Sequence, residues 1–422
     1  MKPGQMAFRL AIVVACIIAL ACVLLVGVKA SVPRPPASEE PVTLQFFGMH
    51  IQDYKGNGWP TIPFGSWRDS IGWRNVEPQK GVWDFKNVDA EVDAATQHNV
   101  ELLLDIGFTP LWASGAPDKQ CRVGKGLCAE PANIQDWRDY IHTLGTRYKG
   151  RVKYYEIWNE PNDTNFYTGT IPGLVQMSKV AREVFKSIDP EIQVVSPVPT
   201  SPAGLTLLDS FFAAGGGSAV DIVGFHFYVA PSQPEGIFSY VQQLYQIMQK
   251  HGVGNKPIWD TENGWRLDKL DPDTQMAYLA RTMLLERAAG ASRVFWFSWG
   301  YCDEPQGMCF TEMDRRTPSA AARSLKVLED WLIGSSVESC DSTDRPQPRG
   351  LSHALWVCRL VRQDRSDYVV WSPDTDREFS VPDNWGVRID QVRYLSGESK
   401  ELPNPRRTTV GKQPVLFTHG EP

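Results

Sequence analysis

The chain has 422 residues, enough for one large domain with a small one, or for two to three domains. Its 49 acidic residues against 43 lysines and arginines give a formal charge of -6. This charge argues against nucleic acid and against an anionic membrane surface as partners. Fifteen tryptophans are many for this length. Core packing accounts for most of them, and the remainder are candidates for a binding surface.

The N-terminal segment is the most apolar part of the chain. Leu10 to Val28 carries no charge and has about the length of a membrane-spanning helix, with Lys2 and Arg9 before it. Positive residues on that side predict that the rest of the chain faces out of the cytoplasm. Ala30 ends a stretch that also fits signal cleavage. We therefore expect residues 1–30 to be an inner-membrane anchor or the signal of a secreted, periplasmic protein.

A linker and a large alternating domain follow. Residues 31–41 are rich in Pro, Ser and Glu and are typical of an exposed linker. Residues 42–334 alternate between strand-like and helix-like runs, which predicts an α/β fold, a (β/α)8 TIM barrel. The expected strands are 42–50, 65–72, 100–107, 153–159, 193–197, 221–227, 257–262 and 293–299. The expected helices are 88–98, 134–149, 171–188, 237–251, 272–289 and 317–332.

Residues 335–422 have a different pattern. Short alternating runs at 355–360, 368–371 and 387–394 are separated by turn-rich pieces. This pattern predicts a small antiparallel β domain. Structural support of the barrel and sugar or partner binding are both open as its role.

The cysteines indicate an oxidising compartment. Cys16 and Cys22 fall in the apolar segment, and the even number that remains outside it is typical of disulfides. Six cysteines allow fifteen connectivities. Their closeness in sequence favours Cys121 with Cys128, Cys302 with Cys309, and Cys340 with Cys358. A zinc site is the rival interpretation, but the spacings and the lack of matched histidines argue against it.

Two strand-like runs each end in a glutamate. Glu160 follows an aromatic run and precedes Pro161, which cannot donate to a strand ladder. Glu262 ends a second run and precedes an Asn-Gly turn signal. Strand C-termini form the active face of such a barrel. Two carboxylates about 5–5.5 Å apart are what retaining glycoside hydrolysis requires, one as acid and one as nucleophile.

These runs resemble a known family. Trp158-Asn159-Glu160-Pro161 and the segment from Asp260 to Trp265 are similar to the retaining glycosidases of clan A, and the segment from Trp73 to Phe85 narrows this to glycoside hydrolase family 39. The resemblance covers residues 42–334. It implies that Glu160 is the general acid/base and Glu262 the nucleophile. It also implies a β-sandwich beside the barrel.

The resemblance extends to residues around the two acids. It implies that Arg68 and Tyr228 donate to Glu262, and that Asn159 binds the substrate 2-hydroxyl. His226 is expected to orient the acid/base or to touch substrate. Glu156 and Asp260 lie deeper in their strands and are expected to be buried partners of a polar network. Other residues near strand ends are candidates either for sugar contact or for core packing: His50, Trp112, Trp265, Trp296 and Trp299.

The sequence therefore predicts a retaining glycoside hydrolase acting on a polysaccharide or oligosaccharide. Resemblance to enzymes encoded with exopolysaccharide genes favours endo-cleavage of a bacterial exopolysaccharide. A transglycosylase on the same site, and a non-catalytic carbohydrate-binding or scaffold barrel, are the alternatives. Two carboxylates and water suffice for this chemistry, so no metal and no organic cofactor are expected.

Overall fold

The computed structural model describes residues 40–266, 269–302, 308–342, 355–363, 365–385, 389–402 and 406–419. Within these residues, no helix combines the length and the apolarity needed to cross a membrane. The predicted span from Leu10 to Val28 lies outside them, as do nearly all of the predicted linker and Cys16 and Cys22.

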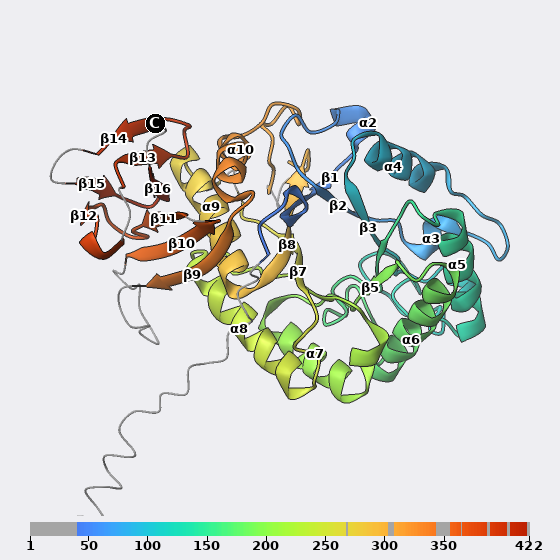
Figure 1. Ribbon diagram of the computed structural model, residues 1–422. Helices are drawn as coiled ribbons and strands as arrows, with labels where there is room; N and C mark the ends of the chain where they lie inside the picture. The colour runs from blue at the N-terminus through green and yellow to red at the C-terminus, as the bar shows by residue number, and fades with distance from the viewer. Residues whose placement is uncertain are drawn as a thin grey trace, which may run out of the picture. The chain divides into compact units, whose positions relative to one another are not determined.

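Eight parallel strands form the barrel (Figure 1). The sheet runs in the order β5-β4-β3-β2-β1-β8-β7-β6. A bridge between Val195 of β5 and Ile222, just before β6, joins its two outer strands and closes the ring. The strands are β1 Phe47–Ile51, β2 Ser66–Ser70, β3 Glu101–Asp105, β4 Tyr154–Glu156, β5 Gln193–Val195, β6 Val223–Phe225, β7 Ile258–Asn263 and β8 Ala291–Trp299.

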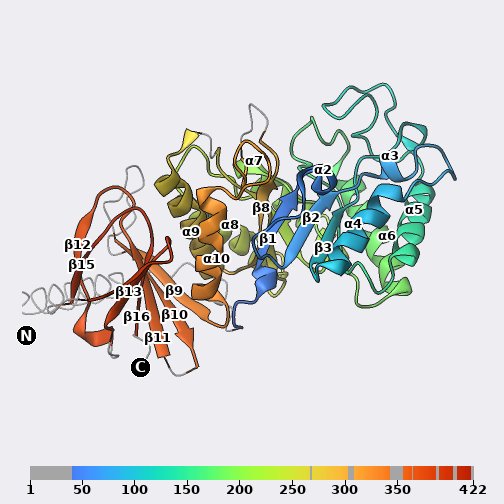
Figure 2. The same ribbon diagram turned by 90° about the horizontal axis from the view of Figure 1, so that it is seen from above.

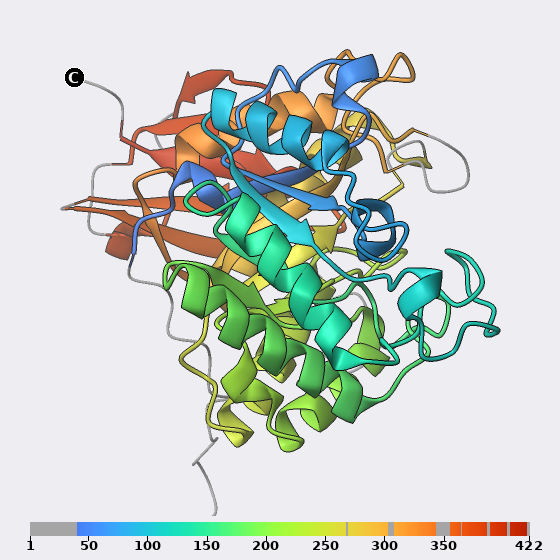
Figure 3. The ribbon, with the colours of Figure 1, turned by 90° about the vertical axis from the view of Figure 1, so that its right-hand side faces the viewer.

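Helices cover the outside of this ring, and Figure 3 shows α5 and α6 side by side on it. The helices are α2 Tyr54–Asn57, α3 Trp73–Val76, α4 Lys86–Gln97, α5 Ile134–Arg147, α6 Ile171–Ile188, α7 Ser201–Ala213, α8 Glu235–Lys250, α9 Pro272–Ala289 and α10 Ala320–Leu332. The predicted bounds of α6 and α9 agree with the structure to the residue. Helix α7 was not predicted, although Pro202 in its first turn is compatible with a helix start.

The barrel interior is filled by side chains rather than open. Its apolar cluster consists of Leu103, Val195, Val198, Ile222, Trp259 and Phe295. At the end opposite the strand C-termini, Arg293 pairs with Glu101 and donates to the Tyr154 hydroxyl at 3.1 Å. This packing leaves the C-terminal ends of the strands as the face that carries chemistry.

The C-terminal region forms two antiparallel sheets, six-stranded and two-stranded (Figure 2). A separate apolar cluster that includes Val370, Phe379 and Phe417 packs between them. The order of the larger sheet is β14-β13-β16-β11-β10-β9, and β12 pairs with β15. The strands are β9 Ser336–Ser342, β10 Trp356–Arg362, β11 Arg365–Trp371, β12 Arg377–Ser380, β13 Gln391–Tyr394, β14 Ser399–Glu401, β15 Arg407–Val410 and β16 Val415–Thr418.

Helix α9 is buried on every side over its second half, from Leu279 to Ala289. It packs against α8, α10, β8 and β9, so it joins the barrel to the C-terminal sheet. Glu235 of α8 pairs with Arg281 of α9 and accepts a 2.8 Å bond from the indole of Trp371 in β11. The C-terminal strands therefore complete the packing around this helix.

The three predicted disulfides are confirmed. Cys121–Cys128 and Cys302–Cys309 lie in the loops after β3 and β8, and Cys340–Cys358 joins β9 to β10. The first two therefore stiffen loops on the face formed by the strand C-termini. A disulfide of this kind stabilises mainly by restricting the unfolded chain.

Candidate active site

Glu160 stands on a sharp turn just past β4. Its φ of +43° is unusual for a residue with a side chain, and Pro161 after it disfavours the ordinary helical conformation. Its backbone N–H donates to Val198 O at 2.7 Å, and Asn159 bridges to Val198. The segment after β5 therefore holds the turn in place. Left-handed backbone at a non-glycine residue costs on the order of 1–3 kcal/mol and is often found at functional sites.

Glu262 lies in β7, within a bulge. Between Asp260 and Asn263 this strand advances three residues while β8 advances two, from Val294 to Trp296. Such a bulge re-aims the side chains around it. Asp260 consequently faces outward to α9, whereas Glu262 reaches Arg68 of β2 across the barrel.

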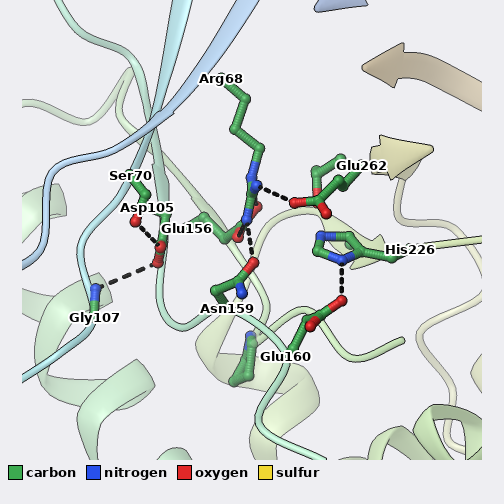
Figure 4. A network of polar contacts seen from close by, with 12 residues as sticks. Arg68, Ser70, Asp105, Gly107, Glu156, Asn159, Glu160, His226 and Glu262 are labelled. Atoms are coloured by element: carbon green, nitrogen blue, oxygen red, sulfur yellow. Dashed lines mark hydrogen bonds and ion pairs between the residues drawn. The ribbon is translucent and has the colours of Figure 1, made fainter. Parts of the chain in front are cut away.

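Arg68 is the hub of the site (Figure 4). It is buried, and its guanidinium contacts both oxygens of Glu156, one of these contacts measuring 3.0 Å. It also donates to Asn159 Oδ1 at 2.8 Å and to Glu262 Oε2 at 3.2 Å. Burial alone would lower the pKa of Arg68, but Glu156 raises it, so Arg68 stays charged. Because Asn159 Oδ1 faces Arg68, the amide NH2 of Asn159 is the end left to donate to a substrate.

Glu160 is held by a neutral histidine. His226 Nδ1 lies 3.1 Å from Glu160 Oε1, and burial lowers the pKa of His226 to about 3. An uncharged ring therefore shares a hydrogen bond with the carboxyl through Nδ1. Burial raises the pKa of Glu160 to about 6, with Arg68 opposing this rise. The carboxyl thus keeps its proton at a higher pH than an ordinary glutamate does, as a general acid requires.

The two carboxylates face each other. Ligand atoms of Glu160, His226 and Glu262 all lie within 4.8 Å of one another, and the two glutamate side chains are 15% and 17% exposed. This spacing suits a retaining glycosidase better than the 6.5–9.5 Å or so of an inverting one. The same three groups could present ligands to a metal. However, both Glu262 oxygens already accept bonds from Arg68 and Tyr228, and the charge of Arg68 would repel a cation.

Tyr228 gives Glu262 its second donor, through a 3.0 Å bond to Oε1. Burial raises the pKa of Tyr228 well above its usual value, so the hydroxyl keeps its proton. We expect Tyr228→Phe to lower kcat/KM by about 10–100-fold, since a hydrogen bond to a charged group contributes about 1.5–3 kcal/mol. Steady-state kinetics on an aryl glycoside, with thermal unfolding as the folding control, measures this. Unchanged kinetics would mean that the hydroxyl does not act on Glu262 during turnover.

The structure separates the five residues that the sequence offered as candidates for sugar contact, His50 and four tryptophans, by their position relative to the two acids. His50 donates from Nε2 to Thr261 O at 2.8 Å and is partly buried near Arg68 and His226. The Trp112 indole donates to Glu77 O, packs on Trp73 and lies under the Lys80 ammonium, so its contacts are away from the two acids. The remaining three indole side chains are 3% exposed or less, which favours core packing over sugar contact: Trp265, Trp296 and Trp299.

Sequence reasoning missed Glu286 of α9. Glu286 Oε1 accepts a hydrogen bond from Asn263 Nδ2 at 2.8 Å, and the Glu286 carboxyl shares another with Asp260. Asp260 in turn accepts a hydrogen bond from the backbone N–H of Glu262 at 3.3 Å. Burial raises the pKa of Glu286 well above its usual value, so it carries the shared proton. A lone acid within the apolar stretch of α9 was the signal that could have identified it.

We expect the two obvious replacements of Glu286 to differ. Glutamine keeps a donor for Asp260, whereas leucine leaves Asp260 and Asn263 without their buried partner. Because each orphaned polar group costs about 1–3 kcal/mol, Glu286→Leu should lower the free energy of unfolding by roughly 2–4 kcal/mol more than Glu286→Gln does. Urea unfolding of both variants tests this. Equal losses would show that the proton on Glu286 is not a structural donor.

A (β/α)8 barrel with two facing glutamates at its strand C-termini is the architecture of a retaining glycosidase. Residues 57–258 match the model of glycosyl hydrolases family 39. A β-xylosidase from Geobacillus stearothermophilus is 25% identical over 280 residues, covering 58% of this chain and 54% of that one. The chain thus spans about half the length of this curated relative.

Solved structures share the fold. A family 39 glycoside hydrolase from Bacteroides cellulosilyticus superposes with a TM-score of 0.70 at 18% identity, over 89% of this chain and 82% of that one. A family 39 β-xylosidase from Caulobacter crescentus gives 0.61 at 16% identity, over 91% and 98%. Residues 57–258, a little under half of the chain, are therefore similar in sequence to glycosyl hydrolases family 39, and the solved structures show that the fold is shared.

Proposed function

We propose that the protein is a retaining glycoside hydrolase that cleaves the backbone of a β-linked polysaccharide by double displacement. The observation that carries this proposal is the facing pair Glu160 and Glu262, with atoms of both within 4.8 Å. The pair differs in environment, because Glu160 is bonded to a neutral histidine and Glu262 to a charged arginine. A barrel that only bound sugar would not need such a pair.

Each step follows from this difference. In the first, a carboxylate oxygen of Glu262 attacks the anomeric carbon, the glycosidic C–O bond breaks, and Glu160 gives its proton to the leaving oxygen. In the second, Glu160 takes a proton from water, which attacks the same carbon and releases Glu262. His226 Nδ1 holds Glu160 Oε1 at 3.1 Å, which leaves Oε2 as the oxygen free to face the leaving group. Arg68 compensates the charge of Glu262 between turnovers.

The substrate and location are proposed from indirect observations. The relatives named above include β-xylosidases, and an endo-1,4-β-xylanase from Gibberella zeae is 26% identical over 104 residues, so xylan-type backbones belong among the candidates. Endo-cleavage of a bacterial exopolysaccharide outside the cytoplasm remains our expectation from the family resemblance. Three disulfides are consistent with an oxidising compartment.

The experiment uses the chain from residue 31 onward, with xylan, other β-linked polysaccharides and the host exopolysaccharide as substrates. New reducing ends are followed for the parent, Glu160→Gln and Glu262→Gln. Oligosaccharide release by the parent alone supports endo hydrolysis, and release of single sugars indicates exo action. Polymer binding without new reducing ends, even with added sugar acceptors, would contradict the proposal and favour a binding protein.

A further inference from the structure

Two arginines in the segments that follow β2 and β3 lack the acidic partner that many arginines in the described residues have. Arg74 and Arg122 form no ion pair with any carboxylate in the part of the chain that the structure describes. Elsewhere in those residues arginine is commonly paired with an acid, as in Arg68, Arg138, Arg147, Arg151, Arg182, Arg281 and Arg293.

Both arginines are held in place without an ion pair. The Arg74 guanidinium lies 5.4 Å from the centre of the Phe108 ring and donates to Val123 O at 3.4 Å. The Arg122 guanidinium lies 5.6 Å from the centre of the Phe166 ring. The Phe108 and Phe166 rings are themselves 6.5 Å apart. The four side chains therefore form one row, in which each cation is oriented by an aromatic ring.

The row lies on the acid/base side of the site. Arg74 is the second residue of α3, which follows β2 after a short turn, and its N–H donates to Phe108 O, just past β3. The Cys121–Cys128 disulfide closes the loop that carries Arg122, whose N–H donates to Asn165 O in the loop after Glu160. Arg122 is close enough to lower the pKa of Glu160, and Asp163 opposes it.

The proposed reaction places the leaving-group sugar on the Glu160 side of the site. Glu160 protonates the leaving oxygen, so the sugar that departs must lie beside Glu160. Arginine binds carboxylate and sulfate groups through its planar fork, and a stacked guanidinium is already ordered for such contact. A neutral sugar gives neither arginine a counter-charge.

We infer that Arg74 and Arg122 form a subsite for an acidic sugar on the leaving-group side, so that the preferred polysaccharide carries a carboxylate or sulfate next to the bond that is cleaved. The inference rests on the proposed function for the position of the leaving group. The negative charge of such a sugar is complementary to two cations that form no ion pair with an acid in the described residues. Two acids lie in this region without pairing with either arginine. Asp105 acts on Arg74 only at longer range and already accepts from the Ser70 hydroxyl and the Gly107 N–H. Asp163 Oδ1 accepts the backbone N–H of Asn165 at 2.8 Å.

The test compares polymers that differ only in charge. Glucuronoxylan, its carboxyl-reduced form, and sulfated xylan are given to the parent, to Arg74→Gln, Arg122→Gln and the double variant. Lys125→Gln is the matched control, since Lys125 lies in the same disulfide loop but pairs with Asp118. We expect the parent to prefer one of the charged polymers, and which one it prefers distinguishes carboxylate from sulfate. Each arginine replacement should reduce that preference about tenfold, and the control should keep it.

Two results would overturn the inference: equal cleavage of charged and reduced polymers by the parent, or a preference that survives in the double variant. If the parent cleaves none of these three polymers, the wider panel described above decides the proposed function, and calorimetric binding of the same polymers to Glu262→Gln decides the subsite alone. Tighter binding of a charged polymer that disappears when both arginines are replaced would support it. Equal binding of charged and reduced forms would overturn it.

Discussion

Replacing Glu262 with glycine is expected to lower kcat by about 10⁴–10⁶-fold, the range found when a covalent nucleophile is removed. The fold should survive, because Arg68 keeps Glu156 and Asn159 as partners when Glu262 is gone. Glycine also opens space beside the anomeric carbon. Added azide should enter it, restore part of the rate on an activated aryl glycoside, and give a glycosyl azide of inverted configuration.

The matched control is Glu191→Gln, an exposed glutamate of the same barrel, which should keep the parental rate. Mass spectrometry and NMR of the azide product complete the measurement. If Glu262→Gly is as active as the parent, or if azide yields a product of retained configuration, Glu262 is not the nucleophile.

Replacing Glu160 with glutamine is expected to have an effect that depends on the leaving group. General acid catalysis contributes about 10²–10⁴-fold, and that loss should appear with sugar leaving groups. An aryl group that leaves without a proton should be affected much less in the first step. Comparing kcat/KM on an oligosaccharide and on a dinitrophenyl glycoside measures the difference. Equal losses on both substrates would contradict the role of Glu160 as acid.

The same residue sets the alkaline side of the pH profile. Burial raises the pKa of Glu160 to about 6, and the protonated form is the active one. The kcat/KM of the parent should therefore fall as pH rises through about 6, and Glu160→Gln should lose this descent because its amide does not titrate in that range. A descent that persists in the variant would assign it to another group.

Much of this site could be predicted because the end of a strand can be recognised from a short stretch of sequence. The runs that end in Glu160 and Glu262 were visible in the sequence, and a parallel barrel brings such ends to one face. Arg68 and Tyr228 were placed as donors to Glu262 by family resemblance, and the structure has both bonds. Their catalytic roles stay predictions until the variants are measured.

The parts that could not be predicted depend on packing between distant segments. The bulge in β7 sends Asp260 to α9, and no property of the strand alone indicates it. The burial of Trp296 and Trp299 depends on which faces the neighbouring strands and loops cover, so their position at strand ends did not distinguish stacking on sugar from packing in the core. The pairing of Glu286 with Asp260 likewise needs the helix and strand in contact.

The most direct test of the central claim is the configuration of the first sugar released. Proton NMR recorded during early hydrolysis, before mutarotation, reports the anomeric form of the new reducing end. Glu160 and Glu262, facing each other within 4.8 Å, predict that the product keeps the configuration of the substrate bond. Inversion would contradict the double displacement, because water would then have attacked directly with no covalent bond to Glu262.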